Sequence, residues 1–389
     1  METNFDSIVN RRGTGSLKWD VEEGELPMWV ADMDFPAAPC IRRALEARVA
    51  HGVFGYNILP DAWAEAYVQW WDRRHGFRME KDWLIFCTGV VPALSTAVRK
   101  LTTPAENVLI QTPVYNIFFN SILNNGRRVL ESPLRYEDGC YSIDWEDLEA
   151  KLADPQTSLM ILCNPHNPTG NIWTREELCR IAELCAAHHV TVLSDEIHCD
   201  LTDPGYAYTP FAAASELCRQ ISVTCVAATK AFNMAGLQSA AVCVPNPLLR
   251  HRMWRGLNTD EVAEPNSFAV TAVVAALREG APWLDELRAY LAENKRLVAR
   301  FIEAELPMLH LTPSHATYLL WLDISALGWD SESVAAHIRR CTGLYLSAGK
   351  AFGGPQDSFL RLNTACPRQI LQEGLQRLKE GILSLSSPV

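Results

Sequence analysis

The sequence predicts an α/β fold: a mostly parallel central sheet with helices beside it, followed by a smaller α+β domain. Two observations carry this prediction. Short apolar runs in the middle of the chain alternate with longer amphipathic ones, and strand–helix–strand repeats are typical of parallel sheets. Polar residues suited to chemistry also follow several of these runs within a few positions. The expected strands are 84–88, 108–112, 159–164, 190–194, 221–227 and 240–244.

The remaining elements can be assigned in chain order. Residues 1–45 contain three prolines and little periodicity, so we expect a segment that packs with the small domain rather than a domain. Residues 46–280 would form the large domain, in which Thr174 and Glu177 form a capping box that opens a helix ending at His188. Residues 281–389 would form the small domain. Its expected elements are a helix at 283–304, a strand at 316–323, a helix at 331–340 and a closing helix from Pro367.

Composition narrows the class of function. The 389 residues include 35 basic and 46 acidic side chains, a net charge of −11, without a basic cluster, which argues against nucleic acid or an anionic membrane as partner. The N-terminus lacks a signal-peptide pattern and no apolar run is long enough to span a membrane, so we expect a cytoplasmic enzyme acting on a small molecule. Twelve cysteines without a Cys-x-x-Cys pair indicate reduced, buried thiols, and we assign no metal site.

One lysine suggests a specific chemistry. Lys230 stands 35 residues after Asp195, and Asn167 precedes both. A buried lysine can form a Schiff base with the aldehyde of pyridoxal phosphate (PLP), while a carboxylate keeps the pyridine nitrogen protonated. Asn167 would donate a hydrogen bond to the ring hydroxyl. Taken alone, an Asp–Lys pair is more often a pair of solvated surface charges.

The positions of these residues strengthen the interpretation. Gly89, Tyr115, Asn167, Asp195 and Lys230 each follow one of the expected strands within a few residues. Ligands of parallel α/β sheets bind beyond the carboxyl ends of the strands. We therefore expect all five residues at one edge of the sheet.

These residues lie within motifs that together resemble fold-type I PLP enzymes, a three-layer transferase fold, and among them the MalY/PatB-type cystathionine β-lyases, or carbon–sulfur lyases, which include cystalysin. The resemblance covers essentially the whole chain. Its motifs are Gly15–Asp20, Val30–Phe35, Gly55–Tyr56, Thr88–Ala93, Ser194–His198, Thr229–Asn233, Phe359–Asn363 and Cys366–Arg368.

The resemblance implies roles for residues around the cofactor. Lys230, Asp195 and Tyr115 would be catalytic, with Tyr115 stacked on the cofactor ring rather than serving as a half-buried core tyrosine. Val90 and Val91 open a helix whose free backbone N–H groups can hold the phosphate. The other implied cofactor-binding residues are Asn167, His198, Thr229 and Tyr56. Tyr56 would reach the phosphate of a neighbouring subunit, which implies a homodimer.

Two residues are assigned to the substrate. Arg361 is the candidate clamp for the α-carboxylate, because a guanidinium binds a carboxylate with two parallel hydrogen bonds; the alternative is a surface arginine. Asp32 is placed beside it. Three positions depart from the pattern of the related enzymes. Ala227 replaces a phosphate-binding serine, Gln238 replaces the arginine of aminotransferases, and His315 replaces an acidic residue expected near the substrate side chain.

The implied reaction is β-elimination from cystathionine or another S-substituted cysteine, giving thiol, pyruvate and ammonia. The freed Lys230 amine would remove the Cα proton. An aminotransferase is the alternative enzyme, and His198 and Gln238 favour the lyase because aminotransferases of this fold carry tyrosine and arginine there. A regulatory protein that binds a transcription activator, as some related lyases do, is a third and weaker hypothesis.

Overall fold

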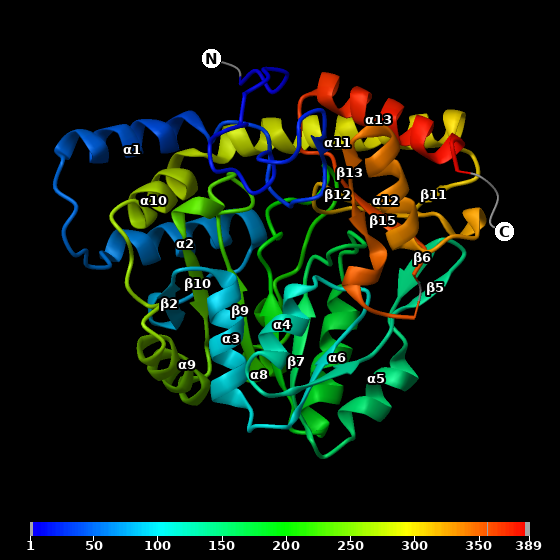
Figure 1. Ribbon diagram of the computed structural model, residues 1–389. Helices are drawn as coiled ribbons and strands as arrows, with labels where there is room; N and C mark the ends of the chain where they lie inside the picture. The colour runs from blue at the N-terminus through cyan, green and yellow to red at the C-terminus, as the bar shows by residue number, and fades with distance from the viewer. Residues whose placement is uncertain (1–2, 356, 386–389) are drawn as a thin grey trace.

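A seven-stranded sheet forms the centre of the computed structural model, which describes residues 3–355 and 357–385 (Figure 1). The strand order is β2-β10-β9-β8-β7-β3-β4, and among these seven strands β10 alone runs in the direction opposite to the others. The predicted α/β fold with a mostly parallel sheet is therefore confirmed. The strands are β2 (Leu84–Cys87), β3 (Asn107–Ile110), β4 (Arg128–Glu131), β7 (Thr157–Cys163), β8 (Thr191–Asp195), β9 (Ser222–Val226) and β10 (Ala240–Cys243).

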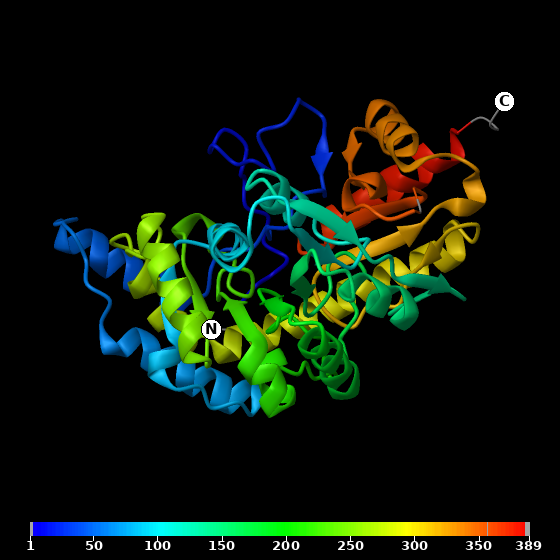
Figure 2. The same cartoon turned by 90° about the horizontal axis from the view of Figure 1, so that it is seen from below.

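Both faces of this sheet are buried, which explains why its strands read as continuous apolar runs. Along β3, Val108 and Ile110 join an apolar cluster with α3, α4 and α9, whereas Leu109 joins a cluster with α5 to α8 on the other face (Figures 1 and 2). The helices are α3 (Val90–Leu101), α4 (Ile117–Leu123), α5 (Trp145–Leu152), α6 (Arg175–Ala187), α7 (Phe211–Ala214), α8 (Glu216–Ile221) and α9 (Pro247–Thr259). The predicted capping box is present at the start of α6.

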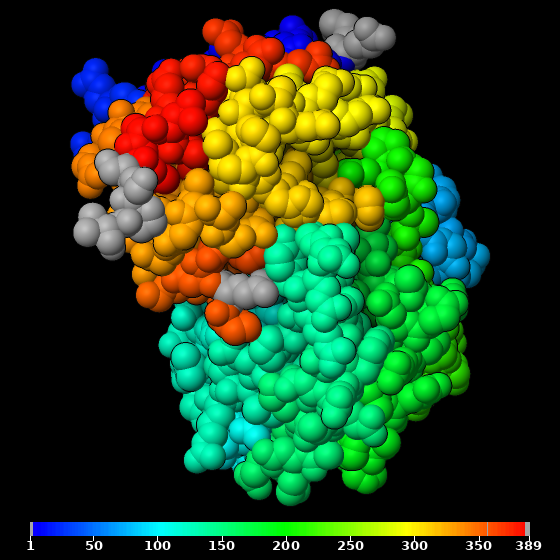
Figure 3. Space-filling view, turned by 90° about the vertical axis from the view of Figure 1, so that its right-hand side faces the viewer, coloured from blue at the N-terminus to red at the C-terminus, as the bar shows by residue number. Residues whose placement is uncertain are grey.

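A second, antiparallel sheet of order β11-β12-β15-β14 is built from the C-terminal part of the chain. Figure 3 shows the C-terminal part of the chain, coloured yellow to red, gathered mostly above teal and green residues from the middle of the chain. The predicted strand at 316–323 begins later, because Ala316 instead bridges to Thr202. The elements are α11 (Ala281–Glu305), β11 (His310–Leu311), β12 (Leu319–Asp323), α12 (Ser331–Thr342), β13 (Leu344–Tyr345), β14 (Ser347–Ala348), β15 (Phe359–Asn363) and α13 (Arg368–Leu383).

The N-terminal segment connects the two sheets. Its strand β1 (Leu26–Pro27) pairs with β13, and its residues 30–35 are held by two asparagines. Asn233, on the large-sheet side, donates to the carbonyls of Met33 and Phe35, whereas Asn363 of β15 donates to those of Val30 and Asp32. The segment thus contacts both sheets, and the predicted division of the chain at residues 45 and 280 stays a prediction.

Three helices and one hairpin complete the architecture. Helices α1, α2 and α10 pack together at the edge of the molecule beside β2, and the chain between α1 and α2 forms an outlying loop in Figures 1 and 2. No helix of the described residues is both long and apolar enough to cross a membrane. These elements are α1 (Pro39–His51), α2 (Asp61–His75), α10 (Ala269–Glu279) and the hairpin of β5 (Arg135–Glu137) and β6 (Cys140–Ser142).

Candidate active site

The predicted site residues meet at the carboxyl ends of the central strands. A cavity of about 210 Å³ opens there, and Asn167, Asp195 and Lys230 line it from the segments that end or follow β7, β8 and β9. Most of the other predicted cofactor residues line the same cavity. They are Val90, Val91, Tyr115, His198 and Thr229.

Asp195 is buried at the base of this cavity. Its carboxylate accepts a hydrogen bond from the backbone N–H of Ile197 (3.1 Å) but from no side chain of the described residues. Burial raises the pKa of Asp195 to about 7, because an isolated charge is unfavourable away from water. The site is therefore prepared for a cationic group, such as a protonated pyridine nitrogen.

Lys230 extends from the loop after β9. Its ammonium nitrogen donates a hydrogen bond to the carbonyl of Ala31, so the N-terminal segment covers the lysine. Burial lowers the pKa of Lys230 to about 8. A substantial fraction of this side chain is then a neutral amine near pH 8, which is the form that attacks an aldehyde or accepts a proton.

Asn167 and His198 offer polar atoms to the same space. The side-chain oxygen of Asn167 accepts from Arg361, which turns its amide nitrogen into the available donor. His198 is buried, and burial lowers its pKa to about 3, so the ring is neutral. Its Nδ1 atom has no hydrogen-bond partner within the described chain. Unpaired buried polar atoms that face a cavity fit a polar ligand.

The end of the cavity that is lined by the start of α3 suits a phosphate. Helix α3 begins there after Gly89, and the backbone N–H groups of Val90 and Val91 lie in its first turn, where no intrahelical acceptor exists. The hydroxyl of Ser239 is also buried in the lining and has no partner among the described residues. Ala227 packs in the apolar cluster around α3 and supplies no hydroxyl, in line with the departure seen in the sequence.

Ser239 is a site residue that the sequence analysis missed. It lies between Gln238, whose backbone is left-handed (φ 54°), and β10. A single serine in such a turn is ordinary, so only the packing of β10 against β9 and β2 reveals that its hydroxyl faces the cavity. Gln238 lines the cavity as well.

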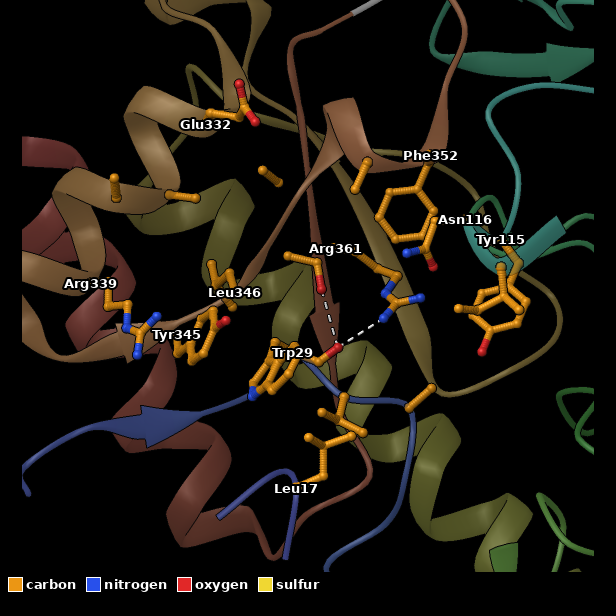
Figure 4. Close-up of a pocket in the computed structure, with 18 of the residues that line it drawn as sticks. Leu17, Trp29, Tyr115, Asn116, Glu332, Arg339, Tyr345, Leu346, Phe352 and Arg361 are labelled. Carbon is orange, nitrogen blue, oxygen red and sulfur yellow. Dashed lines mark hydrogen bonds between the residues drawn. The ribbon is translucent and has the colours of Figure 1, made fainter. Parts of the chain in front are cut away.

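A larger cavity of about 820 Å³ adjoins this one and shares Ala31, Tyr115 and Lys230 with it. Arg361 of β15 is buried in its wall and donates to the Trp29 carbonyl (2.8 Å) and to Asn167 (3.2 Å), as the dashed line to Trp29 in Figure 4 indicates. Its Nε atom lacks a partner within the described residues. The alternative of a surface arginine is thus excluded, and an anion-binding group faces the cavity that Lys230 lines.

Two predicted residues lie outside both cavities. Tyr56 is fully exposed on the loop between α1 and α2, so nothing within a single chain uses it. Asp32 lies beside Lys230, but its carboxylate is bound by Arg11 (2.7 Å). The geometry therefore gives Asp32 an electrostatic influence on Lys230, and its direct contact with substrate stays a prediction.

His315 lies outside the two cavities that Lys230 lines. The residue lines a separate cavity of about 760 Å³, which neither Lys230 nor Arg361 lines. The His315 N–H donates a hydrogen bond to the Gly170 carbonyl, and the His315 carbonyl accepts one from the Asp203 N–H. The imidazole ring stacks on the Tyr206 ring, with the ring centroids 4.0 Å apart. These contacts hold the ring in this separate cavity, and a role beside the substrate side chain stays a prediction.

The chain is similar to known proteins over nearly its whole length. The family model described as aminotransferase class I and II matches residues 30–378. The chain is 44% identical to cystathionine beta-lyase PatB of Bacillus subtilis over 97% of this chain and 100% of that protein. It is 34% identical to protein MalY of Escherichia coli, with 97% and 98% covered. Cystalysin of Treponema denticola, whose crystal structure contains pyridoxal 5'-phosphate, superposes with a TM-score of 0.96 at 32% identity, covering 99% and 100% of the two chains.

Proposed function

Because this chain belongs to the class I and II aminotransferase family, we propose that it is a PLP-dependent carbon–sulfur lyase that splits S-substituted cysteines into a thiol, pyruvate and ammonia. The observation that carries the proposal is that the Lys230 amine and the Arg361 guanidinium line one cavity beside a buried Asp195. The similarity to PatB, named a cystathionine beta-lyase, and to PLP-containing cystalysin supports both the reaction and the cofactor.

Pyridoxal phosphate, when bound, supplies an electron sink for the bonds at the substrate Cα. The chain would hold it by covalent attachment at Lys230, by Asp195 at the ring nitrogen and by Asn167 at the ring hydroxyl. The N-terminus of α3, with Thr229 and Ser239, would bind the phosphate. Tyr115 would cover the ring face.

The substrate steps follow from Arg361 and Lys230. Arg361 would bind the α-carboxylate through two parallel hydrogen bonds and so orient the Cα–H bond. Once the substrate amine has taken its place on the cofactor, the freed, neutral Lys230 amine would take the Cα proton, after which the Cβ–S bond breaks and sulfur leaves with the bonding electrons. Addition of water to the remaining three-carbon unit releases pyruvate and ammonia.

Two observations favour the lyase over the aminotransferase. His198 is neutral and buried beside Lys230, so it brings no positive charge near the Cα proton acceptor. Gln238 lines the phosphate side without the charge of an arginine. Both residues differ from the tyrosine and arginine that the aminotransferase alternative predicts.

The direct test is thiol release. Purified protein loaded with PLP should release thiol and pyruvate from cystathionine, S-methyl-cysteine or S-benzyl-cysteine, and Lys230→Ala loaded in the same way should not. Transfer of the amino group to an added keto acid with the sulfur side chain retained would instead establish the aminotransferase.

A homodimer is the second part of the proposal. The loop between α1 and α2 exposes Val53, Phe54, Tyr56 and Ile58, each more than half accessible to solvent. Consecutive exposed apolar side chains mark a protein interface rather than a solvated loop. A second copy of the chain, covering this loop and receiving Tyr56 at its phosphate site, accounts for both features.

A further inference from the structure

The cavity in front of Lys230 is larger than cysteine requires. At about 820 Å³ it has the volume of sites that take drug-sized ligands, roughly 300–1,000 Å³. From Lys230 and Arg361 it extends outward between the N-terminal segment and α12, as far as Glu332 and Arg340. A substrate held by its α-carboxylate at Arg361 would therefore extend its sulfur substituent into this outer part.

One wall of the outer part is a stack of flat groups, which we call the Trp29 stack: Trp29, Tyr345 and Arg339. The rings of Trp29 and Tyr345 are stacked, with centroids 4.7 Å apart and planes 13° apart. The Arg339 guanidinium lies over the same Tyr345 ring, 3.6 Å from its centroid. Figure 4 shows the three side chains following one another along the cavity.

The Trp29 stack is fixed from both ends. Glu25 binds the Arg339 guanidinium with two hydrogen bonds (2.6 and 2.9 Å), and the pairing of β1 with β13 sets the position of Tyr345 beside the N-terminal segment. At the inner end the Trp29 carbonyl accepts from Arg361 (2.8 Å) and from the Ser347 hydroxyl (3.2 Å). A wall that is ordered before binding loses little entropy when a ligand packs on it.

Beside this wall, much of the lining is small and apolar. Ala335 and Ala336 of α12, with Ala348 and Ala351, leave space, and Leu346 and Phe352 add apolar surface. This part of the cavity therefore favours a flat or apolar group.

The charges at the mouth argue against a zwitterion. Its two carboxylates are already paired, Glu25 with Arg339 and Glu332 with Lys350 (2.8 Å). Arg340 has no carboxylate partner in the described part of the chain. The distal end of cystathionine carries an ammonium as well as a carboxylate, and the ammonium would find no free acceptor carboxylate here.

We propose that this enzyme selects cysteine conjugates whose sulfur carries a planar, apolar group, and that the Trp29 stack is the wall that binds this group. The inference rests on the proposed β-elimination. Trp29 contacts the substrate, whereas Arg339 and Glu25 are positioning residues that hold the stack in place.

Kinetics with matched substrates test the inference. In the wild-type protein kcat/KM for S-benzyl-cysteine should exceed that for S-methyl-cysteine, and for cystathionine, by about tenfold or more, the size expected from one aromatic contact plus buried apolar area. Trp29→Ala should remove most of this preference by raising KM for S-benzyl-cysteine much more than KM for S-methyl-cysteine. Ala335→Phe, which fills part of the outer cavity one turn before Arg339 on α12, should have the same selective effect.

Two further variants separate the role of the stack from general stability. Arg339→Gln removes the bidentate anchor of the stack and should reduce the preference without changing kcat for S-methyl-cysteine. Lys350→Gln breaks an exposed ion pair at the mouth and should leave kcat/KM unchanged for both S-benzyl-cysteine and S-methyl-cysteine. Unaltered S-methyl-cysteine turnover verifies in each case that the protein is folded.

The outcomes of these measurements separate the proposed selectivity from the proposed lyase activity on which it rests. Equal kcat/KM values for S-benzyl- and S-methyl-cysteine, or an equal loss of both in Trp29→Ala, would overturn the selectivity while the lyase stands. A tenfold preference for cystathionine that Arg340→Gln abolishes would overturn it in favour of a zwitterion site. Failure of all three substrates with a PLP-loaded protein would overturn the lyase itself.

Discussion

Arg361 donates a hydrogen bond from its guanidinium to the side-chain oxygen of Asn167, at 3.2 Å and out of contact with solvent. The two residues come from different sheets: Arg361 lies in β15, and Asn167 follows β7. The bond therefore links the proposed carboxylate clamp to the proposed ligand of the cofactor hydroxyl. It also fixes which end of the Asn167 amide can donate to the cofactor.

This relationship predicts the effect of a conservative change at Arg361. Arg361→Lys keeps the charge but loses the two parallel hydrogen bonds to a carboxylate and the contact with Asn167. KM for S-methyl-cysteine should rise by about 10- to 100-fold, the range for one or two charge-assisted hydrogen bonds. The exposed Arg300→Lys is the matched control and should keep the wild-type KM. An unchanged KM in Arg361→Lys would remove Arg361 from substrate binding.

Lys230 is predicted to carry the cofactor covalently. Borohydride reduction of PLP-loaded protein should add the mass of reduced cofactor to a single peptide, the one that contains Lys230. Lys230→Ala should lose the label and at least about 1,000-fold in turnover, since it removes both the attachment point and the proton acceptor. Lys295, another buried lysine, is the matched control, because an ion pair with Asp203 (2.8 Å) holds it outside both site cavities. Label on Lys295 or any other lysine would contradict the assignment.

We predict that the Asp195 carboxylate lowers the free energy of unfolding of the cofactor-free protein as pH rises toward neutrality. Its pKa is raised on folding, from 3.8 to about 7, so its contribution to stability is complete below pH 4 and is lost as pH rises toward 7. Asp195→Asn avoids this loss. The melting temperature of the cofactor-free variant should therefore exceed that of the wild type by more at pH 8 than at pH 5, a difference in unfolding free energy of about 2–3 kcal/mol at most.

The same variant should bind PLP less tightly, because an amide cannot stabilise a protonated ring nitrogen. The exposed Asp82→Asn serves as the control and should shift neither the pH dependence of melting nor PLP affinity. If the melting difference between Asp195→Asn and wild type does not grow from pH 5 to pH 8, the carboxylate is not the isolated buried charge described above.

The loop between α1 and α2 predicts a subunit interface. Light scattering should give a dimer, and Tyr56→Phe should lower PLP affinity by about 1.5–3 kcal/mol, the contribution of one hydrogen bond to a charged group. Tyr206→Phe is the control, since the Tyr206 side chain is about half exposed and stacks on His315, away from this loop. A monomer with full PLP affinity would show that Tyr56 has no role in the site.

The central sheet was predictable from the sequence because its strands are buried on both faces and read as apolar runs. Edge elements were not. Strand β4 and the hairpin of β5 and β6 are partly exposed and mix apolar with charged residues, so they carry no clear period. The strand at 316–323 was placed three residues early because Ala316 and Thr317 are apolar or β-branched, yet Thr317 takes a left-handed backbone (φ 65°).

The residues at strand ends could be predicted because topology brings such positions together. Contacts between distant segments could not. The stacking of Trp29 on Tyr345 joins positions more than 300 residues apart, and neither residue stands out by its local pattern. The place of His315 depends on distant contacts in the same way: its ring stacks on Tyr206, its N–H donates to the Gly170 carbonyl, and its carbonyl accepts from the Asp203 N–H.

The measurement that tests the central claim most directly is the product balance of PLP-loaded protein with S-methyl-cysteine in the absence of any keto acid. Elimination predicts methanethiol, pyruvate and ammonia in a ratio of one to one to one, over many turnovers, because the amino group leaves as ammonia and the cofactor is not consumed. Turnover that stops after one equivalent per site, resumes on addition of a keto acid and leaves the sulfur attached to the product would contradict the lyase and establish an aminotransferase.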